Sequence, residues 1–274
     1  MRHLAAKSCP DGYGMRWVDL HTGDLKEARH LQPAHLHDGF NDAVDAMSHS
    51  ARVGVLHLRE KIVGAAPTLL ENTHPFTFGN WSWTHNGSLE HFSEHRAELL
   101  AEISPELHQR FVGTTDSEHA FYLFLTKLQS VSTNWNEASA SESAKAIELT
   151  LETLARITGH HDFPSAMNFI AFSKSVVLAT RYNRQLVAAE ISGDGKAVPL
   201  RGLQAGDRTL GGVMVASEPY QRSLGWTEVP ERAILALDVE PGSPLLLKVL
   251  ADEQLFPLRM NPEAEARRGL EAWE

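Results

Sequence analysis

The sequence contains a single cysteine, Cys9, among its 274 residues. One thiol excludes an internal disulfide and a thiolate-rich metal site, since both need more than one cysteine in the chain. A protein with so few thiols fits a reducing compartment, and we expect it to be cytoplasmic. We also expect no metal and no other cofactor. His91 and His95 have a helical spacing, but no third ligand is evident beside them, which favours a solvated helix face.

Positive charge is scarce as well. Lys and Arg number 25 against 35 Asp and Glu, a formal net charge of −10. No Lys- or Arg-rich run offers a surface that could follow phosphates, so we expect neither nucleic acid nor an anionic membrane surface as a partner. No apolar run approaches the roughly 18–20 residues that span a bilayer. The apolar stretch within residues 1–8 is too short for a signal peptide.

The remaining composition is that of an ordinary globular protein, with 42% hydrophobic and 22% charged residues. Internal repeats and Pro/Gly/Ser-rich linkers are absent from the sequence, so we expect one domain over residues 1–274, with a charged tail at 263–274. Apolar periodicity predicts helices and strands in blocks, which favours an α+β fold with antiparallel sheets. The expected helices are 36–48, 89–103, 116–130 and 143–158, and the expected strands are 15–19, 52–59, 81–85, 166–173, 176–182, 186–191, 212–217, 233–238 and 244–249.

Four polar positions near the ends of these elements suit a small zwitterionic ligand. Arg59, at the end of a strand, can present a fork of N–H donors to a carboxylate. Asp116, at a helix start beside the capping position, can face an ammonium group. The Asn86 amide and the Gly87 backbone N–H could together stabilise an oxyanion. The pocket would thus take a small-molecule substrate with an amino acid head group.

Each of these positions also has a plainer interpretation. Asn86–Gly87 is the commonest signal for a tight turn, and we expect the strand that begins at Trp81 to stop there. Arg59 could be an ordinary ion-pair arginine. His74 could be a core histidine rather than a ligand contact. The polar segment 132–143 is predicted to be an exposed loop.

The ordered set of motifs resembles the class II, N-terminal-nucleophile glutamine amidotransferases, in particular the stand-alone YafJ-like type. Members of that family carry sequences that match this chain over most of its length. The matching segments are Asp11–Gly14, Leu56–Arg59, Glu71–Phe76, His85–Gly87, Thr115–Glu118, Ala216–Pro219, Trp226 and Val229–Glu231. The resemblance implies a four-layer αββα sandwich of two mainly antiparallel sheets between helices.

The resemblance also implies a reaction, the hydrolysis of the glutamine side-chain amide to glutamate and ammonia. By resemblance, Arg59 binds the glutamine α-carboxylate and Asp116 its α-ammonium group. Asn86 and Gly87 form the oxyanion hole, and His74 lines the pocket. A partner enzyme that accepts the ammonia is implied only by the family, and the sequence does not identify it.

The family's nucleophile is a cysteine directly after the initiator methionine, and this chain has Arg2 there. Its first strand is therefore expected to be missing, either because the sequence is N-terminally truncated or because the protein is an inactive binding homologue. Hydrolysis of a γ-glutamyl peptide or thiol conjugate is a further alternative. Cys9 adjoins the Asp11–Gly14 loop and is expected to be a partly exposed thiol rather than the nucleophile. Ile62 stands where many relatives have Thr.

Overall fold

The computed structural model describes residues 9–60, 67–159, 164–191, 197–199, 212–219, 225–240 and 245–250. The helices are α1 (Gly39–Ser50), α2 (Phe92–Ala101), α3 (Pro105–His108), α4 (Asp116–Val131) and α5 (Ala140–Thr158), with 3-10 turns at Ala34–Leu36, Leu70–Asn72 and Trp135–Glu137. Ile62 and the charged tail at 263–274 lie outside the described residues. Among the described residues, no helix is both long and apolar enough to cross a membrane.

The strands form three sheets, in which every described pair is antiparallel. Sheet A has the order β2 (Leu25–His30), β1 (Tyr13–Asp19), β3 (Ala51–Leu58). Sheet B has the order β13 (Leu245–Val249), β12 (Ala233–Asp238), β7 (Val176–Arg181), β6 (Ala166–Phe172), β5 (Trp81–Ser88), β4 (Phe76–Phe78). Sheet C comprises β10 (Val213–Ala216), β8 (Val187–Ile191), β11 (Thr227–Glu228) and β9 (Ala197–Pro199). The expected α+β class with antiparallel sheets is confirmed.

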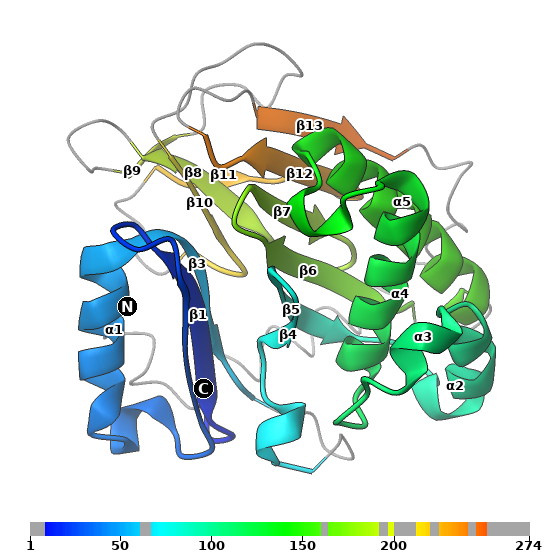
Figure 1. The fold of residues 1–274 in the computed structure, drawn as a ribbon, viewed down its shortest axis with the longest axis horizontal. Coiled ribbons are helices and arrows are strands. Elements are labelled where there is room, and N and C mark those ends of the chain that lie inside the picture. The colour runs from blue at the N-terminus through cyan, green and yellow to red at the C-terminus, as the bar shows by residue number, and fades with distance from the viewer. Residues whose placement is uncertain are drawn as a thin grey trace.

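Sheets A and B lie face to face with helices outside them, α1 beyond sheet A and α4 and α5 beyond sheet B (Figure 1). The outer face of sheet A presents Met15 and Trp17 to Phe40 and Val44 of α1. Its inner face presents smaller apolar side chains that meet Phe172 of sheet B. Successive side chains of a strand point to opposite faces of the sheet, so each strand contributes to two different cores.

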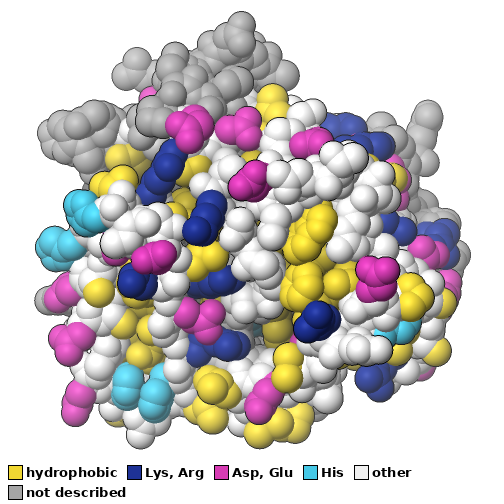
Figure 2. Space-filling model, viewed as in Figure 1, with side chains coloured by type: hydrophobic (Ala, Val, Ile, Leu, Met, Phe, Trp, Pro, Cys, Tyr) yellow, Lys and Arg dark blue, Asp and Glu magenta, His cyan; other side chains and the backbone are white. Residues whose placement is uncertain are grey.

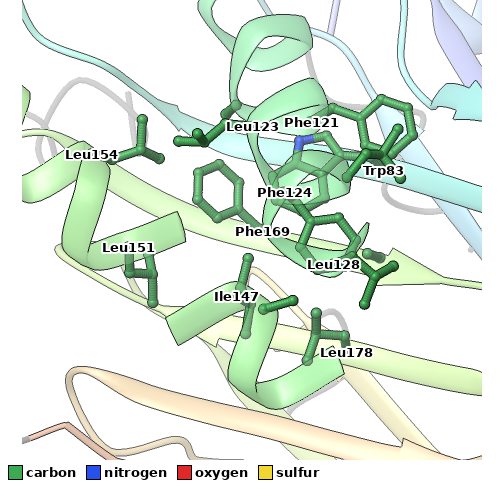
Figure 3. Close-up of a cluster of buried hydrophobic side chains, with 14 of the residues drawn as sticks. Trp83, Phe121, Leu123, Phe124, Leu128, Ile147, Leu151, Leu154, Phe169 and Leu178 are labelled. Atoms are coloured by element: carbon green, nitrogen blue, oxygen red, sulfur yellow. The ribbon is translucent and has the colours of Figure 1, made fainter. Parts of the chain in front are cut away.

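The largest core lies between sheet B and helices α4 and α5 (Figure 3). Trp83 of β5 stacks on Phe121 and Phe124 of α4 and meets Phe169 of β6, with ring centroids 4.5–5.8 Å apart. Trp81 and Trp83 are fully buried. These two tryptophans therefore pack sheet B against α4.

Two helix starts follow from side-chain capping. Thr115 accepts the backbone N–H of Glu118, which fixes the first turn of α4 at the predicted position. Ser139 and Glu142 form a reciprocal capping box at the start of α5. The helix therefore begins at Ala140, and the prediction of a loop through residue 143 was wrong.

The predicted end of the strand at Asn86–Gly87 was also wrong. β5 runs on through Asn86 and Gly87 to Ser88, and these residues pair with Asn168, Met167 and Ala166 of β6. A ladder with a buried neighbour supplies more bonds than a local turn, so the pairing overrides the turn propensity of the dipeptide. The extension places both residues on a rigid strand.

Smaller differences concern element ends and short elements. The first two predicted helices are shorter, at Gly39–Ser50 and Phe92–Ala101, and the segment before α1 is a 3-10 turn. Five elements were not predicted because they are short or lack an apolar alternation, namely β2, α3, β4, β9 and β11. The segment 132–143 was predicted to be an exposed loop. It contains Trp135, whose ring stacks on Phe78 with centroids 5.6 Å apart.

Candidate active site

The predicted site residues come from four segments that meet at one end of sheets A and B. Arg59 follows β3, His74 precedes β4, Asn86 and Gly87 lie in β5, and Asp116 opens α4. Ser82 of β5 accepts a hydrogen bond from Arg16 of sheet A, so the even-numbered residues of β5 face sheet A. Asn86 therefore faces the space between the sheets. Figure 2 shows Lys and Arg side chains, with Asp and Glu side chains among them, on the visible face between sheet A and strands β4 and β5.

Arg59 is 6% exposed and is fixed through its backbone. Its N–H donates to the carbonyl of Gly12 at 2.9 Å, and its carbonyl accepts the N–H of Asp11 at 3.2 Å. Burial lowers the pKa of the guanidinium, and the nearby Asp11 carboxylate opposes that shift. Because Asp11 balances part of the charge, a ligand carboxylate would compete with it for Arg59. The position of Asp11 beside Arg59 was not predicted from the sequence.

The rings of His57 and His74 are in contact beside Arg59, tilted by 39° with centroids 4.2 Å apart. Burial, then the charges of His85 and Arg59, lowers the pKa of His57 to about 4. Burial lowers the pKa of His74 well below its usual value, and the neighbouring His57, His85 and Arg59 act in the same direction. Both imidazoles are therefore neutral at pH 7. Neither ring nitrogen of His74 has a hydrogen-bond partner within the described part of the chain.

Gly14 allows the backbone of His74 to lie close to sheet A. A Cβ at Gly14 would lie 1.8 Å from the carbonyl oxygen of His74. Gly14 pairs with His57 across β1 and β3, so both histidines rest on the inner face of sheet A. Gly12, by contrast, has φ of +100° and supplies the turn before β1. The two glycines of the Asp11–Gly14 motif thus serve different needs, and only the first needs positive φ.

His85 of β5 connects this pair to the start of α4. Its Nε2 donates to the carbonyl of Ala166 at 2.8 Å, since a carbonyl can only accept. Burial lowers the pKa of His85, while the carboxylate of Asp116 opposes that shift. The ring is then neutral. Its Nδ1 lies 3.0 Å from Ser117 Oγ, and the single proton of that hydroxyl also has Asp116 Oδ1 as an acceptor at 3.1 Å.

Asp116 is bonded within the protein. Its Oδ2 accepts the backbone N–H of Leu89 at 2.8 Å, and its Oδ1 accepts the backbone N–H of Ser117 at 2.7 Å. A carboxylate has about four lone-pair sites, so these bonds leave capacity for a ligand ammonium group. Asp116 therefore fastens the end of β5 to the start of α4.

Asn86 is oriented by a residue that the sequence analysis missed. Nη1 of Arg184 donates to Asn86 Oδ1 at 3.2 Å, across 98 positions of sequence. Gly87 lies against the backbone of β6, where an added Cβ would stand 2.0 Å from the Ala166 carbonyl oxygen. Arg184 also lowers the pKa of His85, which puts its charge close to the same cluster. No local sequence pattern marks Arg184, because its role depends on a long-range approach.

A second network joins the motifs around His74 and Asp116. Asn72 accepts the N–H of Thr114 at 2.9 Å and donates to the carbonyl of Pro67 at 3.1 Å. Glu118 accepts the N–H groups of Val112 and Gly113, each at 3.0 Å. Several motif residues thus hold loops in place. The motif spacing singled out Asn72 and Glu118, but it could not separate these holding positions from ligand contacts.

Cys9 does not resemble an activated nucleophile. Burial and the carboxylates of Glu60, Glu218 and Asp11 raise the pKa of its thiol to about 11. A nucleophilic cysteine needs the thiolate, which this surrounding suppresses at neutral pH. Within the described ranges, no group of three or more His, Cys, Asp or Glu side chains is arranged to hold a metal ion.

These placements bring the predicted residues together around three neutral histidines. The Arg59 charge acts on His57 and His74, and the Asp116 charge acts on His85. Arg59 and Asp116 thus place opposite charges beside one cluster of uncharged imidazoles. Roles for the five predicted residues in ligand binding or catalysis stay predictions.

Comparisons with known proteins agree on one family. The model of the class II glutamine amidotransferases matches residues 2–241. The chain is 27% identical over 264 residues to the probable glutamine amidotransferase DUG3 of Saccharomyces cerevisiae, covering 89% of this chain and 72% of that protein.

Two solved structures share the fold. One is a glutamine aminotransferase class-II domain protein, SPO2029, from Silicibacter pomeroyi (TM-score 0.58, 20% identity, 88% of this chain and 92% of that one). The other is a predicted glutamine amidotransferase from Pseudomonas aeruginosa (TM-score 0.55, 18% identity, 87% of each chain). With a family match over most of its length and this fold, the chain belongs to the class II glutamine amidotransferases.

Proposed function

We propose that the site binds L-glutamine as a zwitterion. Arg59 binds the α-carboxylate, Asp116 binds the α-ammonium group, and His74 lines the pocket between them. The observation that carries this proposal is that a buried guanidinium and a carboxylate both lie beside one cluster of neutral imidazoles. Low polarity around such charges strengthens their attraction for a ligand of complementary charge.

We further propose that the bound amide is hydrolysed when a cysteine nucleophile is present. A thiolate would attack the side-chain carbonyl carbon, and the electron pair of the C=O bond would move to oxygen. The Asn86 amide and the Gly87 N–H would donate to that oxyanion. As the tetrahedral species collapses, the leaving nitrogen takes up the proton that the thiol had lost, the C–N bond breaks and ammonia is released. Water then hydrolyses the thioester to glutamate.

The nucleophile is the part that the printed sequence does not supply, since residue 2 is Arg2. From the family resemblance we infer that it stands at the start of a strand ahead of the Asp11–Gly14 loop. The same resemblance supports the finer fold, a four-layer αββα sandwich of the N-terminal-nucleophile type in a single domain. The order α1, sheet A, sheet B, α4 and α5 is what such a sandwich requires (Figure 1).

Calorimetry with L-glutamine tests the binding proposal. Arg59→Ala and Asp116→Ala should each weaken binding by about 2–4 kcal/mol, because each leaves one partner of a desolvated charge pair alone. Arg156→Ala is the matched control, since Arg156 is half exposed and pairs with Glu98 and Glu102 on the surface. Asp116 also bonds Leu89, so urea denaturation must accompany its measurement. Unchanged binding in both site variants would refute the pocket assignment.

Turnover tests the chemistry. The intact mass and N-terminal sequence of the protein from its native host establish whether a cysteine precedes this sequence. A cysteine-initiated protein should release ammonia from L-glutamine. Turnover of a γ-glutamyl peptide without glutamine turnover would instead identify a γ-glutamyl amide hydrolase. Binding without turnover of either compound would identify an inactive binding homologue, and co-purification with a synthase would identify an ammonia acceptor.

A further inference from the structure

Arg184 lies in the turn between β7 and β8, and its side chain reaches Asn86 of β5. The contact joins Nη1 to Oδ1 at 3.2 Å. A guanidinium has only donors, so the amide of Asn86 must present its oxygen to Arg184. Its Nδ2 is then directed along the other branch of the amide plane. Arg184 thereby decides which end of the Asn86 amide is available to a ligand.

The turn that carries Arg184 is fastened to β6 by a buried amide. Asn168 is 1% exposed and stands directly across from Asn86 in the β5–β6 register. Its Nδ2 donates to the carbonyls of Arg184 at 3.1 Å and Gln185 at 2.9 Å. Its Oδ1 accepts the N–H of Tyr182 at 2.7 Å. One side chain thus ties down the backbone on both sides of residue 183.

A second fastening uses the Val229–Glu231 motif, which the proposed function does not otherwise require. Glu231 Oε1 accepts the backbone N–H of Asn183 at 2.7 Å, and Glu231 also pairs with Arg181 at 3.2 Å. Asn183 adopts φ of +63° and donates from Nδ2 to the Ser165 carbonyl at 2.8 Å. Asparagine adopts the left-handed region more readily than other non-glycine residues, and these bonds hold Asn183 there.

We propose that Arg184 is a positioning residue for the side-chain amide of the substrate. It holds the Asn86 amide so that Nδ2 donates to the substrate's side-chain carbonyl oxygen, and its positive charge reinforces that donation. The substrate class is an α-amino acid whose side chain ends in a carboxamide. This inference rests on the proposed function, and it concerns only the amide end of the ligand.

Two ligands separate the amide end from the head group. L-norvaline has the carbon skeleton of L-glutamine and the same head group, but it lacks the side-chain oxygen and nitrogen. Arg184→Ala should weaken L-glutamine binding at least about tenfold, the effect of losing a hydrogen bond involving a charged group. L-norvaline binding should change by less than about twofold, because its contacts lie at Arg59 and Asp116.

Three further variants distinguish positioning from general damage. Arg184→Lys keeps the charge and a donor and should recover part of the glutamine affinity. In an Asn86→Ala background, Arg184→Ala should cause no further loss, since the two residues act as one unit. Arg156→Ala is the matched control for loss of a positive charge, and it should leave the affinity for both ligands unchanged.

The outcomes discriminate between the two proposals. Equal losses for L-glutamine and L-norvaline in Arg184→Ala would overturn the positioning role and leave the binding proposal intact. Additive losses of Asn86 and Arg184 would do the same. Equal affinity of the unmutated protein for the two ligands would show that the amide end is not recognised, which overturns the inference alone. Binding of neither ligand would overturn both proposals.

Discussion

The stability of the protein should fall when the pH is lowered, because the site buries neutral histidines. His57 has a folded-state pKa of about 4, compared with 6.5 for an unperturbed histidine. Between these values the unfolded chain binds a proton at His57 and the folded protein does not. Stability therefore rises with pH across this window and is lost as the pH falls from about 6.5 towards about 4.

The magnitude follows from the size of the shift. The pKa of His57 is lower in the folded protein by 6.5 − 4, or about 2.5. At roughly 1.36 kcal/mol for each pKa unit, the free energy of unfolding is lower by roughly 3.4 kcal/mol once the pH lies below both pKa values. At about pH 5 the loss relative to pH 7 is roughly 2 kcal/mol for His57 alone. His74 and His85 shift in the same direction and add to the total.

Urea denaturation at about pH 7 and about pH 5 measures this loss. His57→Gln removes the titrating group, so its stability should depend less on pH than that of the unmutated protein, by about 2 kcal/mol over this interval. The comparison uses the difference between the two pH values, so any constant destabilisation by the substitution cancels. His49→Gln, at an exposed position on α1, is the matched control. An identical pH dependence in His57→Gln and the unmutated protein would refute the reasoning.

Three other predictions concern how the site and its supports are built. Asp116→Asn should lower the free energy of unfolding by about 1–3 kcal/mol in urea, because one branch of the amide cannot accept the N–H of Leu89 or Ser117; an unchanged midpoint would contradict it. Gly87→Ala should cost more than about 3 kcal/mol by thermal denaturation, since its Cβ would meet backbone at 2.0 Å. Gly212→Ala, with ordinary contacts, is its control. Ser139→Ala should cost about 1 kcal/mol through loss of the α5 cap, and a helix content and stability equal to those of the unmutated protein would argue against that cap.

The sequence predicted best what depends on local chemistry. The start of α4 follows from the Thr115 cap, and its buried face follows from the spacing of Phe121, Leu125 and Leu128. The motif residues Arg59 and Asp116 stand at the end of a strand and the start of a helix, as expected. Each of these features is set within a few residues of the chain, so one sequence suffices to find it.

The errors arose where distant partners override local preference. Asn86–Gly87 favours a turn on its own, but β6 lies some 80 positions later and captures the segment as a strand. Arg184 is invisible for the same reason, since its contact with Asn86 depends on the β5–β6 register and on the turn held by Asn168. The start of α5 is different. Its Ser139–Glu142 capping box was readable, and the polar composition around it concealed it.

The hydrogen bonds that hold the site residues in place affect the ligand binding proposed above. Asp116 joins β5 to α4, Asn72 joins the loop before His74 to Thr114, and Asn168 holds the turn of Arg184. All of these bonds are made within the protein and none needs a ligand. Since the side chains are already ordered, binding costs little further conformational entropy. The proposed pocket is therefore preorganised, and a ligand carboxylate would compete with the attraction between Arg59 and Asp11. Affinity should accordingly depend on the carboxylate of the ligand more than on any rearrangement of the fold.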